Sequence, residues 1–142
     1  MTTFATSRLL LVDDEPEILA AVAAYLRRRD LLVTTASSYE QADRIVNDPG
    51  QPFDILVTDV RMPDGSGIEL ARTFIRRSSG GPCILMTGHL ELSELSADIL
   101  KSGVIVVHKP FSVSALCAKV REVLAAAPLR GMPDARSTAD LA

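Results

Sequence analysis

The feature that most constrains the fold is an alternation, repeated five times along the chain, between short continuous apolar runs and longer segments with apolar residues at helical spacing. Continuous runs are typical of parallel strands that are covered on both faces. Stripes that recur every three or four residues are typical of helices packed against such a sheet. The predicted strands are Leu9–Val12, Leu31–Thr35, Ile55–Thr58, Cys83–Thr87 and Val104–Val107. The predicted helices carry the stripes Ile18/Val22/Leu26, Tyr39/Ala42/Val46, Ile68/Ala71/Ile75, Leu92/Leu95/Ile99 and Val113/Leu116/Val120.

This order of elements predicts an α/β fold in which five βα units form one doubly wound parallel sheet. Local signals support the helix boundaries, because caps and left-handed residues favour particular side chains. Helix starts are indicated by Pro16 and by the capping-box pairs Ser38/Gln41 and Ser66/Glu69, and helix ends by Gly80, Gly81 and Gly103.

The length of 142 residues predicts a single domain. We expect an N-terminal lead over residues 1–7, the folded domain over 8–127 and a flexible C-terminal tail over 128–142, because periodicity is lost from Pro128 onward. A linker to a further domain would have the same composition. Both interpretations of the tail therefore stay open.

Composition disfavours several classes of protein. The 15 basic and 18 acidic residues give a net charge of −3, whereas nucleic-acid modules usually carry a basic excess, so we expect no direct nucleic-acid binding. The longest apolar run ends at Arg27, well short of the roughly 18 residues that span a bilayer, and predicts no membrane anchor. Cys83 and Cys117 suit neither a disulfide framework nor a zinc site, and no secretion signal precedes the first strand. These features predict a cytoplasmic protein.

Polar residues collect where the predicted strands end. In a doubly wound sheet the ligand crevice lies at the carboxyl ends of the strands, and these positions hold Asp13, Asp14, Asp59, Thr87 and Lys109. Each residue alone could be an ordinary cap, turn former, strand end or solvated charge. Together, three carboxylates at one edge repel one another unless a cation compensates them, which favours a site for a hard ion such as Mg²⁺. Such a site suits phosphoryl transfer to an aspartate.

Four ordered motifs carry a resemblance to a known family. They resemble the response regulator receiver domain of bacterial two-component signalling, from about Arg8 to Ala127. The resemblance implies a flavodoxin-like (βα)5 fold with the strand order 2-1-3-4-5. The motifs are Leu11-Val-Asp13-Asp14-Glu15, Thr58-Asp59-Val-Arg61-Met-Pro63-Asp-Gly65, Met86-Thr87-Gly88 and His108-Lys109-Pro110-Phe111.

The resemblance implies a role for each matching residue. It makes Asp59 the phosphoacceptor. It places Mg²⁺ on Asp13, Asp14 and Asp59 together with the backbone carbonyl of Arg61. It assigns Thr87 and Lys109 to phosphoryl oxygens, with Thr87 shifting on activation. Pro110, which often follows a cis bond in the family, would shape the adjoining loop.

The resemblance also implies partners. The phosphoryl donor would be a sensor histidine kinase or a phosphotransfer protein, and the output a changed surface that binds a downstream protein target. The resemblance also allows a homodimer that forms through the fourth helix, the fifth strand and the fifth helix. The chain would catalyse only its own phosphorylation and dephosphorylation. The alternatives are a phosphorelay intermediate or phosphate sink, and the N-terminal receiver fragment of a transcriptional regulator.

One position departs from the family pattern. The family usually has Tyr or Phe three residues before the lysine, whereas this chain has Val106, so we expect a muted switch or a different route of coupling. A phosphatase of the haloacid dehalogenase type would need a second aspartate where Arg61 stands. A dinucleotide fingerprint starting at Gly65 would need a glycine at Leu70, so we expect no nucleotide cofactor. We assign no metal to the two histidines.

Overall fold

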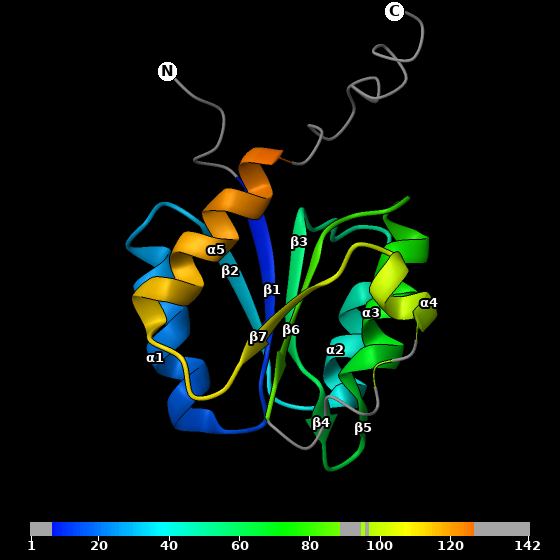
Figure 1. Ribbon diagram of the computed structural model, residues 1–142, viewed down its shortest axis with the longest axis horizontal. Coiled ribbons are helices and arrows are strands. Elements are labelled where there is room, and N and C mark those ends of the chain that lie inside the picture. Colours follow the sequence, from blue (N-terminus) through cyan, green and yellow to red (C-terminus); the bar gives the residue numbers. More distant parts are fainter. Residues whose placement is uncertain (1–6, 89–94, 96, 127–142) are drawn as a thin grey trace, which may run out of the picture.

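The computed structural model describes residues 7–88, 95 and 97–126. It shows a five-stranded parallel sheet with the order β2-β1-β3-β6-β7 (Figure 1), which confirms the predicted α/β fold and the predicted strand order. The strands are β1 Arg8–Val12, β2 Leu32–Ala36, β3 Ile55–Asp59, β6 Cys83–Thr87 and β7 Ile105–His108.

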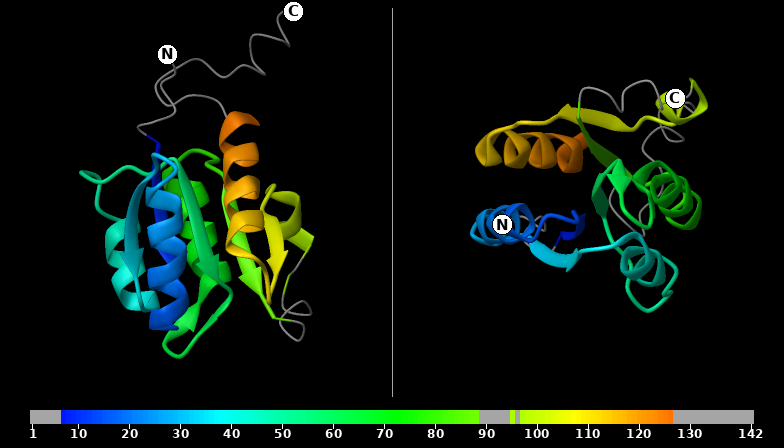
Figure 2. Two further views of the ribbon diagram at one scale, coloured as in Figure 1. Left: turned by 90° about the vertical axis from the view of Figure 1, so that its left-hand side faces the viewer. Right: turned by 90° about the horizontal axis from the view of Figure 1, so that it is seen from below.

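The helices cover both faces of the sheet (Figure 2). One apolar cluster lies between the sheet and α1 and α5, and the other lies between the sheet and α2, α3 and α4. Within the described residues, no helix is both long and apolar enough to cross a membrane. The helices are α1 Pro16–Arg27, α2 Tyr39–Val46, α3 Gly67–Arg77, α4 Ala97–Lys101 and α5 Val113–Ala126.

The three central strands show why continuous apolar runs are needed. Successive residues of β1 alternate between the two clusters: Leu9 and Leu11 pack toward α1 and α5, while Leu10 packs toward α2 and α3. All three side chains are buried. Burying a leucine stabilises a fold by about 1.5–3 kcal/mol, so each face of the strand contributes to the core.

The two edge strands differ slightly from the prediction. Each begins and ends one residue later than its apolar run, and most of their residues are only partly buried. Leu31 remains with the end of α1, where its N–H donates to the Leu26 carbonyl, and Leu32 pairs with Arg8. An edge strand has one neighbour, so that neighbour's register sets its bounds more than hydrophobicity does.

The helix boundaries agree with the predicted local signals in most places. α1 starts at Pro16, and the Ser38 hydroxyl accepts from the Gln41 N–H at 3.1 Å. The Ser66 hydroxyl caps α3 differently from the prediction, because it accepts from the N–H of Ile68 rather than that of Glu69.

The predicted glycine positions after the third and fourth helices are also mostly confirmed. Gly80 and Gly103 have the positive φ expected at helix ends, whereas Gly81 does not. Part of the predicted fourth helix, including Leu92, lies outside the described residues, as do residues 1–6 of the lead and the whole tail.

A short hairpin after Asp59 was not predicted. β4 (Arg61–Met62) pairs antiparallel with β5 (Gly65–Ser66), and the Gly67 N–H donates to the Val60 carbonyl at 2.7 Å to close it. A Cβ on Gly67 would lie 1.8 Å from the Asp59 carbonyl oxygen. Only glycine therefore lets α3 begin so close to the end of β3.

We expect Gly67→Ala to destabilise the fold, because the neighbouring atoms are backbone and cannot rotate away. The expected loss is about 1–3 kcal/mol of unfolding free energy, the usual cost of overpacking. Urea denaturation measures it. Gly50→Ala is the control, since a Cβ there meets only the Asp48 side chain at 3.4 Å. Equal unfolding midpoints for the two variants would contradict the close approach.

Candidate functional site

The site lies at the carboxyl edge of the sheet, where β1 and β3 end side by side. Asp13 directly follows β1, and its N–H donates to the Ala36 carbonyl, continuing the sheet by one residue. Asp59 is the last residue of β3. Both aspartates are buried, so the fold holds two acidic groups where little solvent reaches them.

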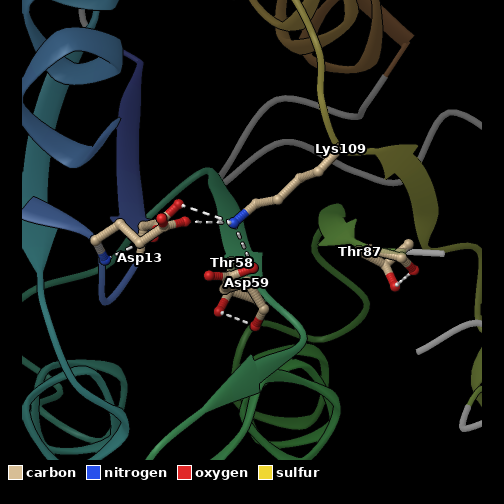
Figure 3. A network of polar contacts seen from close by, with 7 residues as sticks. Asp13, Thr58, Asp59, Thr87 and Lys109 are labelled. Carbon is tan, nitrogen blue, oxygen red and sulfur yellow. Dashed lines mark hydrogen bonds and ion pairs between the residues drawn. The ribbon is translucent and has the colours of Figure 1, made fainter. Parts of the chain in front are cut away.

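Lys109 brings a positive charge to these acids. It follows β7, and its N–H donates to the Thr87 carbonyl at 2.9 Å, which fixes the start of its loop. Its Nζ lies 2.9 Å from Asp59 Oδ1, 3.4 Å from Asp13 Oδ2 and 3.5 Å from Glu15 Oε1 (Figure 3). The lysine thus reaches across the end of β6 and links three carboxylates.

The predicted metal ligands also meet here. One carboxylate oxygen from each of Asp13, Asp14 and Asp59 lies within 4.8 Å of the others. Mg²⁺ is held at about 2.0–2.1 Å by oxygen ligands and usually keeps several waters, so it needs only some of its ligands from the protein. The donor set is all oxygen and acidic, and it fits Mg²⁺. Arg61, whose backbone carbonyl is the fourth predicted ligand, begins β4 two residues beyond Asp59.

Burial and neighbouring charges shift the pKa values of Asp59 and Lys109. Burial raises the pKa of Asp59 from 3.8 to about 7; the hydrogen bond from Lys109 opposes this rise, and the charge of Asp13 adds to it. Burial lowers the pKa of Lys109, but the hydrogen bond and charge of Asp59, together with Asp13, outweigh burial and raise it. Lys109 therefore stays protonated. Any further positive charge near Asp59 would favour the ionised form of its carboxyl group.

Thr87 is placed at the end of β6 but is not directed at Asp59. Its side chain is buried, and its hydroxyl donates to the Gly88 carbonyl at 2.9 Å (Figure 3). A hydroxyl in this position must rotate before it can donate to a group on Asp59. The neighbouring Thr58 hydroxyl is likewise occupied, since it donates to the Asp59 carbonyl at 3.0 Å.

The loop and strand around Lys109 show the other predicted features. The Lys109–Pro110 peptide is cis, as the resemblance implied. Val106 is half-buried on β7. Its neighbours Ile105 and Val107 pack toward α1 and α5, so Val106 lies on the opposite face of the strand, the face covered by α3 and α4.

Sequence reasoning missed one member of the site. Glu15 belongs to the first motif but received no role, although its carboxylate contacts Lys109. The Glu15 N–H also donates to Asp13 Oδ1 at 2.9 Å, which helps to orient that ligand. Its position directly after the acidic pair was the available signal.

Curated relatives with similar sequences are response regulators. The chain is 31% identical over 129 residues to the response regulator protein PilR of Pseudomonas aeruginosa, covering 90% of this chain and 27% of PilR. It is 34% identical over 131 residues to the transcriptional regulatory protein FixJ of Azorhizobium caulinodans, covering 89% of this chain and 60% of FixJ. The chain thus spans only part of the length of these relatives.

Solved structures agree with the sequence relatives. The response regulator receiver protein from Sinorhizobium medicae superimposes with a TM-score of 0.73 at 28% identity, over 85% of this chain and 96% of that one. The response regulator protein TrrA from Thermotoga maritima, solved with Mg²⁺ and BeF, superimposes with a TM-score of 0.70 at 27% identity, over 82% and 98% of the two chains. The family model of the response regulator receiver domain matches residues 9–121, and this chain belongs to that family.

Proposed function

We propose that this domain accepts a phosphoryl group on Asp59 from a phosphohistidine of a sensor histidine kinase or phosphotransfer protein. The observation that carries the proposal is the placement of the Asp59 carboxylate, buried at the sheet edge, 2.9 Å from the Lys109 ammonium and within reach of two further acids. A nucleophilic aspartate needs neighbours that neutralise the charge of the incoming phosphoryl oxygens.

In this proposal an ionised Asp59 oxygen attacks the phosphorus atom, and the bond from phosphorus to the donor's histidine nitrogen breaks. Lys109 already lies on Asp59 and can pair with a phosphoryl oxygen. Asp13, Asp14, Asp59 and the Arg61 carbonyl would hold Mg²⁺, which neutralises charge on the transferring group. Lys109 favours the ionised form of Asp59, against the effect of burial. A bound metal would act in the same direction.

The proposed output is a change of protein-binding surface in the cytoplasm. Rotation of the Thr87 hydroxyl from Gly88 toward the phosphoryl group would start it, and a downstream protein or a second copy of the chain would bind the altered face. The domain then acts on no substrate but its own aspartyl phosphate. Because Val106 offers no aromatic ring, a phosphorelay or phosphate-sink role remains the second candidate.

A third candidate function is that of a receiver domain within a longer transcriptional regulator. FixJ is named as a transcriptional regulatory protein, and this chain covers 60% of it. A receiver joined to a DNA-binding output domain is therefore the third proposal, and the gene sequence beyond codon 142 tests it.

We expect acetyl phosphate with Mg²⁺ to add one phosphoryl group to the protein, and Asp59→Asn to abolish it, because an amide is not a nucleophile. Intact-mass spectrometry measures the labelling. Asp54→Asn is a matched control at the opposite end of β3. Labelling that persists in Asp59→Asn would refute the assignment of the acceptor.

We expect Asp14→Ala to weaken Mg²⁺ binding at least about tenfold, since even a residue outside the first ligand shell of a metal commonly contributes this much. Isothermal titration calorimetry measures the affinity. Glu17→Ala removes an exposed acid from the adjacent turn of α1 and should leave the affinity close to that of the wild type. An unchanged affinity in Asp14→Ala would show that the acidic edge is structural.

We expect the stability of the metal-free protein to fall as the pH rises from about 4 to 7. The folded state raises the pKa of Asp59 from 3.8 to about 7, so it binds the proton more tightly than the unfolded chain does. This contribution is complete below the unfolded value and is lost as pH rises through the folded one.

The amide of the Asp59→Asn variant cannot ionise, so this variant should not show the decline. Its free energy of unfolding should exceed that of the wild type by a difference that grows with pH toward an upper limit of about 4 kcal/mol. Urea unfolding in EDTA at pH 5, 6, 7 and 8 measures the difference. A gain that is the same at every pH would contradict the raised pKa.

A further inference from the structure

The β4–β5 hairpin that follows Asp59 touches a helix outside the site. Its tip residue, Asp64, accepts two backbone hydrogen bonds from the first turn of α2: Tyr39 N–H to Oδ1 at 2.9 Å and Glu40 N–H to Oδ2 at 3.0 Å. In Figure 1 the hairpin lies beside this end of α2. One carboxylate thus joins two segments that are 24–25 residues apart in sequence.

A second contact holds the same two segments together. A Cβ on Gly65 would lie 2.4 Å from Cγ of Tyr39, so the tyrosine ring lies directly against the hairpin backbone. The hydrogen bonds from Glu40 and Tyr39 also lower the pKa of Asp64, which keeps it ionised as an acceptor. The hairpin tip is therefore held by charge-assisted hydrogen bonds and by packing.

The base of the hairpin is held at the site itself. The Gly67 N–H donates to the Val60 carbonyl, and Arg61 pairs with Ser66 across the hairpin. Only Pro63 and Asp64 separate the two short strands. In so short a hairpin, a displacement of the tip also displaces Arg61, whose backbone carbonyl is the predicted metal ligand.

The contacts of Asp64 are not needed merely to start α2. That helix already has its own cap, because the Ser38 hydroxyl accepts from the Gln41 N–H. The Tyr39 and Glu40 N–H groups lie at an exposed helix end, where water could satisfy them. Asp64 therefore serves the placement of the hairpin more than the stability of the helix.

We propose that Asp64 is a positioning residue for the metal: by fixing the β4–β5 hairpin to α2 it sets the place of the Arg61 carbonyl and thereby the affinity for Mg²⁺. This inference rests on the proposed function. Linkage makes the coupling reciprocal, so an ion bound at the site must strengthen the contact between Asp64 and α2 by the same factor.

The first test compares Mg²⁺ affinities by isothermal titration calorimetry in the full-length chain. Asp64→Ala should weaken binding about tenfold, the lower end of the effect of residues that orient metal ligands. Ser38→Ala removes the other cap of α2 without touching the hairpin and should keep the wild-type affinity. Glu40→Gln removes a negative charge from the same turn while keeping its N–H, and should also keep it.

The second test measures backbone hydrogen exchange with and without Mg²⁺. In the wild type the ion should slow exchange of the Tyr39 and Glu40 amides, and in Asp64→Ala it should not. Unchanged affinity in Asp64→Ala would overturn the proposal. So would an equal loss in Ser38→Ala, which would point to helix stability, or in Glu40→Gln, which would point to charge alone.

The same preparations separate this inference from the proposed function. A wild-type protein that neither binds Mg²⁺ nor accepts a phosphoryl group at Asp59 contradicts the function itself. A wild type that does both, with an Asp64→Ala variant that matches it in affinity, contradicts only the positioning role.

Discussion

The burial of two neighbouring carboxylates at one sheet edge is the constraint on which the rest of the site depends. Asp13 and Asp59 are buried on neighbouring strands, and burial alone would keep one of them protonated near neutral pH. Lys109 offsets this cost by reaching from the far side of β6 to both acids. The core thus places the acids, and the last strand supplies the compensating charge.

This arrangement links the contacts of Lys109 to the charge at the site. Lys109 shares its charge among three carboxylates, so a cation or phosphoryl group that enters must redistribute these contacts. The Thr87 hydroxyl is held by the Gly88 carbonyl in the same region and is available for rotation. In the proposed function, a phosphoryl group on Asp59 would change the charge that Lys109 faces and would compete with the Gly88 carbonyl for the Thr87 hydroxyl.

The β4–β5 hairpin offers a route from this edge to α2. It follows Asp59 almost directly, its tip residue Asp64 contacts the first turn of α2, and its second strand leads into α3 at Gly67. This chain has Val106 where the family usually has an aromatic residue, so we expect a muted switch or a different route of coupling. The connection between the sheet edge and α2 consists of directional hydrogen bonds donated by the N–H groups of Gly67, Tyr39 and Glu40.

The sequence by itself determined the sheet, its two covered faces, and the residues at the ends of its strands, because periodicity and strand ends are local patterns. The approach of Asp13, Asp14, Asp59 and Lys109 followed from the rule that parallel strands end at a common edge. Only the tertiary structure decided the raised pKa of Asp59 and the direction of the Thr87 hydroxyl. It also decided the Glu15 and Asp64 contacts and the hairpin itself. These depend on burial and on distances between segments far apart in the chain, which no local pattern encodes.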